Sequence, residues 1–556
     1  MTCLSSFMRR RWIVLAFAAI VIFVLIDFFF TWERLTLTAW SSSTSHFFSI
    51  RGNSTIIQTK SDSLAQPNDF ADATIPKKTV PKVIPMKVEH NASRTASERE
   101  QIQVDDRATS RLELLESEQT DQLELDKQLV YTLSQIIQRT TTKRGIVMPL
   151  FEKLTGLGLS LILELRAMGV SLPIEVPHCT ELNPKTLELL QTKKELGKIR
   201  AYDICDLAAN AKSATNTSRP VFCDNIDACH TKFRSFMIKP LSIVYSQFDQ
   251  ILMLDADTSF FLNPTVLFDS EKFKTTGILL MHDRIGGAGH LARKAPRQPN
   301  LSVEQEYFST FNVTPFRPVP TLQRPKATVP NKTPVKLNFE PSDFLLSSHS
   351  FNRRASHQAD SSQMFWNKKL QPRATVILAS FLAQSDIAPP PSHGDKELFF
   401  FASELAETQY SFSDYSAGSI GSEFEDGGPK KSTLCGILAH VFPIRQEGVP
   451  DDDVPLFSLN NKRVLIFRPD LEPFYYMKAR PWELFPGFIG SRHLHCPFNI
   501  TVGRLNESHI KHFTERRKFL EQGIHEVLGL EISLNGYYGS QLCPYSRRGH
   551  IGEMEN

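Results

Sequence analysis

From about residue 144 onward, short runs of apolar residues alternate with longer stretches in which apolar residues recur at helical spacing. A short apolar run bounded by polar residues is typical of a buried strand, and apolar positions three and four apart are typical of an amphipathic helix. The helical spacing is clearest at Leu157, Leu161 and Leu165. The pattern predicts strands over residues 145–148, 172–176, 198–202, 251–254 and 277–281, and helices over residues 154–168, 184–196 and 232–246. This alternation predicts an α/β domain with a largely parallel sheet and helices on both of its faces.

The N-terminal segment has the pattern of a membrane-spanning helix. Arginines at positions 9–11 precede an uninterrupted apolar run from Trp12 to Ile26, and after Asp27 the run continues towards Trp32. About 20 residues of helix cross the hydrocarbon core of a bilayer, and flanking positive charges stay on the cytosolic side. We therefore expect a cytosolic tail over residues 1–11, a single transmembrane signal anchor over residues 12–32, and a lumenal remainder. A cleaved signal peptide is the alternative, and it also places the chain in the secretory pathway.

The segments around the α/β pattern differ in composition. Residues 33–97 are rich in Ser, Thr, Pro and Lys, a composition typical of a flexible stem. Leucines and isoleucines at helical spacing within residues 98–143 predict a stem coiled coil or a helix docked on the globular domain, and docking is favoured because the spacing is not a clean heptad. The globular domain is expected over residues 144–535, with a Pro-rich surface insertion without regular structure at about 284–341 and a tail over residues 536–556.

Charge and cysteine content limit the partners and the compartment. A net charge of +3 argues against a nucleic-acid-binding surface. Of the eight cysteines only Cys3 falls in the predicted cytosolic tail, and an oxidising lumen favours disulfides among the rest, with at least one thiol left over. Sequons for N-glycosylation begin at Asn53, Asn91, Asn216, Asn300, Asn312, Asn331, Asn499 and Asn506.

The sequence Asp255-Ala256-Asp257 follows directly on the apolar run 251–254. Residues two apart in a strand point to the same side, and ligands of parallel sheets bind at the carboxyl ends of strands. Two carboxylates so placed can hold a hard divalent cation whose open positions are filled by phosphate oxygens of a substrate. Nucleotide-sugar transferases need such a site because negative charge develops on the departing diphosphate. The pattern alone also fits an acidic turn at the end of a strand.

A second copy of the spacing shows how common the pattern is. Asp451-Asp452-Asp453 lies between Pro450 and Pro455 and follows no apolar strand. We expect this copy to be a solvated loop.

Several further blocks accompany the first copy in a fixed order. Lys239-Pro240-Leu241-Ser242 precedes it, and Asn263-Pro264 and Leu267-Phe268 follow it. The other blocks are residues 144–147, residues 172–176, Asp360-Ser361-Ser362-Gln363, Gly394-Asp395-Lys396-Glu397 with Phe400, and Leu434-Cys435-Gly436. Over about residues 144–470 these blocks resemble the fungal-type alpha-mannosyltransferases of glycosyltransferase family 71.

The resemblance implies a GT-A fold and a type II Golgi membrane protein with a lumenal catalytic domain. It further implies GDP-mannose as donor, Mn²⁺ as cofactor, a glycan or glycoprotein acceptor, and transfer with retention, alpha-1,3 being the linkage expected. One departure concerns the metal. Many related enzymes place a late histidine on it, but the corresponding stretch, residues 455–460, has none. His440, His493 and His495 are the candidates for that position.

The resemblance also suggests roles for individual residues. Asp255 and Asp257 are the expected metal ligands. Lys239 is expected to contact a donor phosphate or to pair with an acid, or else to be a solvated lysine without a role. Gln363 is expected to contact the sugar.

The block 394–397 supplies the remaining catalytic candidates. Asp395 or Glu397 is expected near the anomeric carbon or on the acceptor hydroxyl, and Lys396 at the leaving phosphate. Alternatively, these residues form a helix N-terminus that favours acidic side chains.

Two other functions remain open from the sequence. The same fold could transfer a sugar from a different nucleotide, such as a UDP-sugar. The chain could instead be a catalytically silent, membrane-anchored glycan-binding protein. The absence of the late histidine from residues 455–460 favours this alternative. The insertion at 284–341 is expected either to border the acceptor site or to have no role, and oligomerisation through the stem is a further expectation.

Overall fold

The computed structural model describes residues 122–137, 142–284, 300–355, 357–423, 433–460, 469, 472–482, 497 and 500–528. All of them belong to one compact unit of the chain, Arg94–Asn556. The predicted anchor at 12–32, the stem at 33–97 and the tail at 536–556 lie outside these residues, as do His493 and His495. Among the helices that are described, none is both long and apolar enough to cross a membrane.

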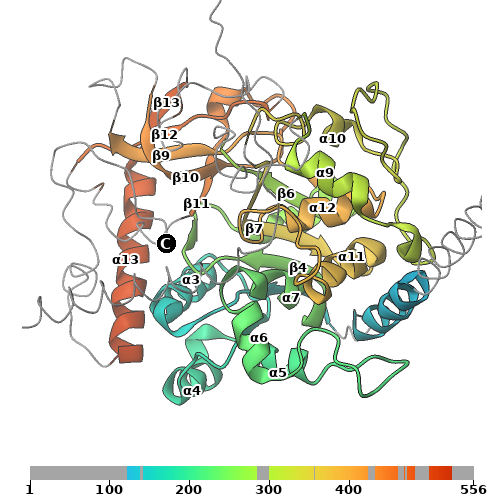
Figure 1. The fold of residues 1–556 in the computed structure, drawn as a ribbon. Helices are drawn as coiled ribbons and strands as arrows, with labels where there is room; N and C mark the ends of the chain where they lie inside the picture. Colours follow the sequence, from blue (N-terminus) through green and yellow to red (C-terminus); the bar gives the residue numbers. More distant parts are fainter. Residues whose placement is uncertain are drawn as a thin grey trace, which may run out of the picture. The chain divides into compact units, whose positions relative to one another are not determined.

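A seven-stranded sheet forms the centre of this unit (Figure 1). Its strands, in the order β3-β2-β1-β4-β7-β6-β8, are β3 (Ile199–Asp203), β2 (Ile174–His178), β1 (Thr142–Val147), β4 (Phe248–Leu254), β7 (Ala359–Asn367), β6 (Ile278–His282) and β8 (Ser411–Phe412). The neighbours β3, β2, β1 and β4 run parallel to one another, β7 runs antiparallel between β4 and β6, and β8 is parallel to β6. The prediction of an α/β domain with a largely parallel sheet is confirmed.

Helices cover both faces of this sheet, which explains why its central strand β4 is apolar on both sides over residues 251–254. In β4, Ile251 and Met253 belong to one core cluster, and Leu252 and Leu254 belong to the other. The first cluster includes residues of α5 (Ile204–Ala209), α6 (Ile226–Phe233), α7 (Ile238–Tyr245), α9 (Val303–Thr310), α10 (Asp343–Ser347), α11 (Pro372–Ala383) and α12 (Leu398–Leu405). The second includes residues of α3 (Thr155–Ala167), α4 (Pro184–Thr192), α8 (Glu271–Thr276) and α13 (Glu507–Leu528).

A second sheet of six antiparallel strands packs into the second cluster. Its strands, in the order β13-β12-β9-β10-β11-β5, are β13 (Val502–Arg504), β12 (Tyr475–Met477), β9 (Gly418–Glu423), β10 (Cys435–Val441), β11 (Leu456–Asn460) and β5 (Thr258–Phe260). Only Asp255-Ala256-Asp257 separates β4 of the first sheet from β5 of the second. The acidic motif is therefore the turn that joins the two sheets.

One predicted helix is wrong as a single element. The stretch 232–246 contains the end of α6, a short 3₁₀ segment (Ser235–Met237) and α7. Ser235 has a φ of 79°, a left-handed conformation that a continuing helix cannot accommodate.

The Pro-rich insertion differs from its expected lack of regular structure. Residues 285–299 lie outside the described part, but residues 300–341 contain α9, which begins with a capping box between Ser302 and Gln305. Phe308, Phe316 and Phe339 are buried in the first core cluster. The prolines had suggested a structureless segment, whereas these phenylalanines anchor it to the domain.

A helix over residues 122–137 packs against the same cluster through Val130, Leu133 and Ile137. Disulfides link Cys179 to Cys205 and Cys223 to Cys229.

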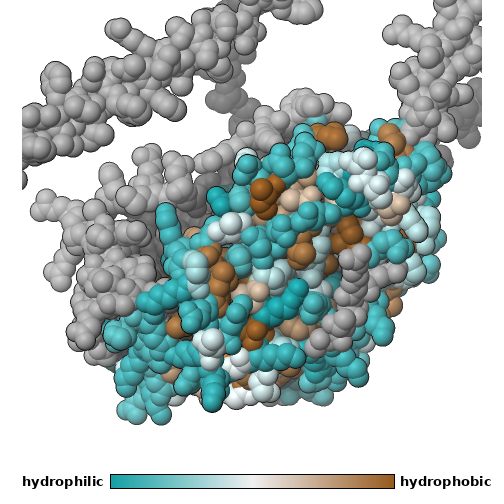
Figure 2. All heavy atoms as spheres, turned by 90° about the horizontal axis from the view of Figure 1, so that it is seen from below, coloured by the Kyte–Doolittle hydropathy of each residue, from teal (hydrophilic) through white to brown (hydrophobic). Residues whose placement is uncertain are grey.

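On the face seen in Figure 2, hydrophobic residues are scattered among hydrophilic ones.

Candidate functional site

The turn between the two sheets is held by backbone hydrogen bonds. The amide of Asp255 donates to the carbonyl of Ser362 in β7 at 2.8 Å, and the amide of Thr258 donates to the carbonyl of Asp255 at 3.2 Å. Ala256 is buried, whereas the side chain of Asp255 is 26% exposed and Asp257 is half-buried. Both carboxylates thus lie at the carboxyl end of β4 and are within reach of solvent.

Lys239, in the first turn of α7, is the buried counter-charge of this turn. Its Nζ lies 2.8 Å from Oδ1 of Asp255 and 3.0 Å from Oδ2 of Asp395. It also donates to the hydroxyl and the carbonyl of Ser361, at 3.0 and 3.2 Å. Of the alternatives for Lys239, the structure shows pairing with acids. The side chain is buried and therefore not a solvated lysine, and these partners occupy its ammonium group.

The charges of Lys239, Asp257 and Asp395 act on the carboxyl group of Asp255. Burial raises the pKa of the Asp255 carboxyl to about 7; Lys239 opposes this shift, and the negative charges of Asp257 and Asp395 add to it. Asp255 and Asp395 therefore share the ammonium group of Lys239, and the charge of Asp257 adds to theirs, so an added cation at the turn would relieve repulsion at Asp255.

The loop before α12 brings Asp395 to Lys239. Gly394 has a φ of 69°, and a Cβ at this position would lie 2.9 Å from the ring of Phe236. Glycine is the residue that meets both conditions without strain. Asp395 itself is 1% exposed, so the structure places it as a partner of Lys239 and not at the surface.

Glu397 is also buried, and it holds the beginning of β7. Its Oε1 accepts from the amides of Gln358 and Ala359 at 2.7 and 3.2 Å. Burial raises the pKa of the Glu397 carboxyl. The structure thus gives this carboxylate backbone partners on a neighbouring strand.

Lys396 points to a second carboxylate, Asp283, which directly follows β6. The distance from Nζ of Lys396 to Oδ2 of Asp283 is 2.7 Å, and Nε2 of His357 lies 3.0 Å from the same oxygen. Burial opposes the charge on Lys396, but Asp283 and Asp360 outweigh it and raise the pKa of the ammonium group. With 28% of its side chain exposed, Lys396 is the most accessible of the three candidates in this loop.

His440, one candidate for the late metal ligand, pairs with a carboxylate. Its Nε2 lies 3.0 Å from Oδ2 of Asp360, and both side chains are 3% exposed. The hydroxyl of Ser362 donates to the same Asp360 oxygen. Across the described residues no group of three or more His, Cys, Asp or Glu side chains is arranged to hold a metal ion.

Gln363 is buried in β7, opposite Leu254. Its Nε2 donates to the hydroxyl of Ser458 at 2.6 Å, and its Oε1 has no hydrogen-bond partner within the described part of the chain. Ser458 belongs to β11, whose residue Asn460 lies opposite Thr258. The stretch in which a late histidine was expected does therefore lie beside the acidic turn.

Asp283, Asp360 and His357 were not singled out from the sequence as site residues. Asp283 follows an apolar strand exactly one position after its end, as Asp255 does, so the same strand-end signal could have identified it. Asp360 and His357 belong to a segment whose approach to the site depends on the antiparallel pairing of β7, which the local pattern did not specify.

The second acidic copy lies apart from these residues. Asp451–Asp453 forms a 3₁₀ turn in which Asp451 accepts from the hydroxyl of Tyr415 and Asp452 pairs with Lys478 at 3.7 Å. Asp452 and Asp453 are exposed, as expected of a solvated segment.

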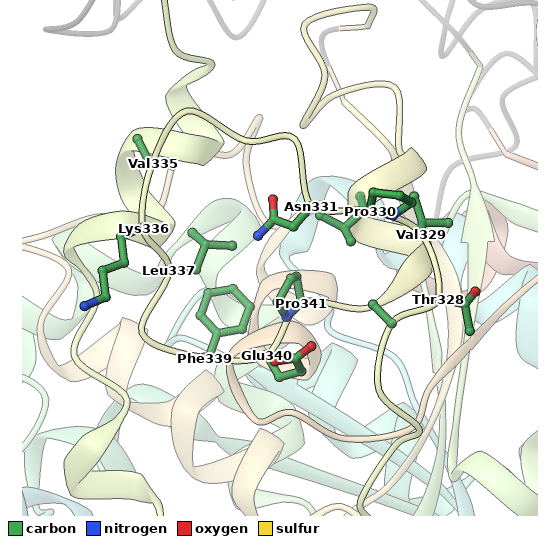
Figure 3. A pocket seen from close by; sticks show the side chains of 12 residues that line it. Thr328, Val329, Pro330, Asn331, Val335, Lys336, Leu337, Phe339, Glu340 and Pro341 are labelled. Carbon is green, nitrogen blue, oxygen red and sulfur yellow. The ribbon is translucent and has the colours of Figure 1, made fainter. Parts of the chain in front are cut away.

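A pocket of about 500 Å³ lies in the Pro-rich insertion and is lined by residues between Ala327 and Leu346. Figure 3 shows Asn331, Leu337 and Phe339 pointing towards the middle of the loop that surrounds it. None of the charged residues around Asp255 lines this pocket, so it is separate from the candidate site.

The acidic turn fits a hard divalent cation. Asp255 and Asp257 offer oxygen ligands, both are accessible, and the local charge favours a cation. Two protein carboxylates suffice for a metal that binds mainly to a diphosphate and water.

The family model described as "Mannosyltransferase putative" matches residues 143–441, which include the acidic turn and the loop before α12. The chain belongs to this family. The resemblance to fungal alpha-mannosyltransferases is thereby confirmed.

Curated relatives agree with this family. The chain is 24% identical over 325 residues to "Probable alpha-1,3-mannosyltransferase MNT4" of Saccharomyces cerevisiae, which covers 56% of this chain and 49% of that protein. It is 30% identical over 150 residues to "Alpha-1,2-mannosyltransferase MNN21" of Candida albicans, covering 25% of this chain and 20% of that protein. The matches to these two relatives thus span half or less of the relatives' own length.

Among solved structures, the chain is similar to mouse xyloside xylosyltransferase 1 in its apo form, with a TM-score of 0.25 and 13% identity. That match covers 49% of this chain and 85% of the mouse chain.

Proposed function

We propose that the protein is a retaining alpha-mannosyltransferase of GT-A fold that transfers mannose from GDP-mannose to a glycan hydroxyl, with alpha-1,3 as the linkage. The observation that carries the proposal is the accessible Asp255–Asp257 turn at the end of β4, in a chain that belongs to the mannosyltransferase family. The donor, acceptor class and linkage are suggested by the resemblance and by the names of the relatives.

In this proposal Asp255 and Asp257 hold Mn²⁺, which would supply positive charge for the diphosphate of the donor. Lys239 keeps Asp255 in place and links it to Asp395, so the loop before α12 and the acidic turn are fixed as one unit. We assign positioning roles to Asp395 and Glu397, because both carboxylates are buried, Asp395 pairs with Lys239, and Oε1 of Glu397 accepts from the backbone.

Lys396 is the cation that we assign to the leaving diphosphate. Its side chain is partly exposed, and Asp283 and His357 orient its end. A preorganised cation at this point stabilises charge that grows in the transition state. Gln363, which is buried, would support the sugar site from behind through Ser458.

We further propose a type II membrane protein of the Golgi with its catalytic domain in the lumen. The predicted anchor at 12–32 supports this location. The disulfides Cys179–Cys205 and Cys223–Cys229 also support it, because such bonds persist in oxidising compartments.

The proposal is tested by substituting the two carboxylates. Asp255→Asn and Asp257→Asn should each lower mannosyl transfer by roughly a hundredfold or more, since a catalytic electrostatic contact contributes about that much. Asp452→Asn, in the exposed second copy, is the matched control and should leave transfer unchanged. Near-normal transfer by both turn variants, in the presence of EDTA, would contradict the proposal.

A further inference from the structure

The last helix in the described part of the chain, α13, lies beyond the family match, which ends at residue 441, yet it packs along α3 (Figure 1). One charged side chain of this helix, that of Arg516, is buried. Arg516 is 2% exposed, and its Nε lies 3.2 Å from Oε2 of Glu164 in α3. Its Nη2 donates to the carbonyl of Thr258 at 3.3 Å and to that of Leu157 at 3.4 Å. Arg516 therefore joins α3 to the residue that follows Asp257.

Glu164 of α3 binds the other two residues of β5, Ser259 and Phe260. Its Oε1 accepts from the amide of Phe260 at 2.5 Å, and its Oε2 accepts from the hydroxyl of Ser259 at 2.8 Å. Nε2 of His512, one turn before Arg516, lies 3.2 Å from the same hydroxyl. All three residues of β5 are thus held by side chains of α3 and α13, immediately after the acidic turn.

Asp257 lies within the electrostatic reach of this pair. Burial lowers the pKa of Arg516, while the negative charges of Glu164 and then Asp257 raise it. A buried ion pair is not needed merely to join two helices, because apolar residues of similar volume do so equally well. What this pair adds is directional hydrogen bonds to the segment that carries Asp257.

We propose that Arg516, paired with Glu164, is a positioning residue that fixes the Asp257 carboxylate for the metal and its diphosphate. This inference rests on the proposed function, since it assigns Arg516 to the metal site suggested there. Residues behind metal ligands commonly change metal affinity when they are lost. The helix α13 therefore contributes a positioning residue to the proposed metal site, although it falls outside the family match.

The test compares Arg516→Lys, Arg516→Met and Glu164→Gln in the full chain with Leu520→Ala. Leu520 is a fully buried residue of α13 with no role in the site, so its variant measures the effect of destabilising the helix alone. Thermal unfolding ranks the variants by stability. Hydrogen exchange at the amides of residues 258–260 reports on β5, and titration with Mn²⁺ in the presence of GDP, followed by the EPR signal of free Mn²⁺, reports on the metal site.

We expect the Arg516 and Glu164 variants to exchange these amides faster and to bind Mn²⁺ roughly tenfold more weakly. Leu520→Ala should leave both readouts at wild-type values even where its melting temperature falls equally. Arg516→Lys keeps the charge but not the fork of donors, so it should lose Mn²⁺ affinity without a large loss of stability.

Unchanged exchange in the Arg516 variants would overturn the inference, whatever the proposed function. An equal loss of Mn²⁺ affinity in Leu520→Ala would also overturn it, because the effect would then be one of stability. If the wild-type chain bound no Mn²⁺ with GDP, the proposed metal site would fail, and the assignment of Arg516 would fail with it.

Discussion

At the scale of single residues, Lys239 is the buried cation that pairs with two carboxylates of the site, those of Asp255 and Asp395. It is 7% exposed and contacts Asp255, Asp395 and Ser361. Without it, two carboxylates would face each other with no cation between them. The family block Lys239-Pro240-Leu241 marked this lysine in the sequence, but its partners lie far along the chain and only the fold identifies them.

Replacing Lys239 with Met should lower the free energy of unfolding by about 3 to 5 kcal/mol, because a buried ion pair loses one partner. A second substitution, Asp395→Asn, should recover part of the loss by removing an unpaired charge. Urea unfolding of the single and double variants measures both effects. Lys478→Met, which breaks a long, partly exposed pair with Asp452, is the control and should cost about 1 kcal/mol or less. A loss in Lys239→Met no larger than in this control would contradict the account.

The pKa of Asp255, raised to about 7, predicts a pH dependence of metal binding. The carboxylate must be ionised to bind a cation, so affinity should fall as pH drops through about 7. Between pH 8 and pH 6 we expect roughly a tenfold loss of Mn²⁺ affinity, as for one proton that competes with the metal. Mn²⁺ titration in the presence of GDP at the two pH values measures it. Equal affinity at both would show that Asp255 does not titrate in this range.

At the scale of elements, the loop before α12 is shaped by Gly394. Its left-handed backbone and the approach of Phe236 both exclude a side chain at this position. The turn sets where Asp395, Lys396 and Glu397 point, so three site candidates depend on one glycine. The sequence predicts Asp395 or Glu397 near the anomeric carbon or on the acceptor hydroxyl, and Lys396 at the leaving phosphate. In the structure Asp395 pairs with Lys239 and Glu397 accepts from the backbone at the beginning of β7, contacts that local sequence does not encode.

Gly394→Ala should be less stable than the wild type by more than the roughly 1 to 2 kcal/mol that a left-handed residue with a Cβ costs. Gly169→Ala is a matched control, because Gly169 has a φ of 80° but nothing within 4 Å of the added Cβ. Adding Phe236→Ala should remove the excess loss in Gly394→Ala. Urea unfolding measures the free energy of unfolding of each variant. Equal losses of this free energy in the two glycine variants would show that Phe236 does not restrict the loop.

At the scale of the whole molecule, apolar runs and helical spacing predicted the parallel part of the first sheet and the position of Asp255 and Asp257 at the end of β4. They did not predict the second sheet, because its short strands pair across long stretches of chain. For example, β5 pairs with β11 about 200 residues later. The same reason hid the pairing of Asp360 with His440, which forms only when β7 and β10 are both in place. Pairing between distant segments thus decides what surrounds the acidic turn.

Metal-dependent mannosyl transfer is tested most directly by a donor panel with a Mn²⁺ titration, using the purified chain and a mannose-terminated oligosaccharide as acceptor. We expect transfer from GDP-mannose and not from UDP-glucose, UDP-galactose or UDP-N-acetylglucosamine. We also expect that EDTA abolishes this transfer and that added Mn²⁺ restores it. Transfer from a UDP-sugar in place of GDP-mannose, or transfer from GDP-mannose that EDTA leaves unchanged, would contradict the proposed function.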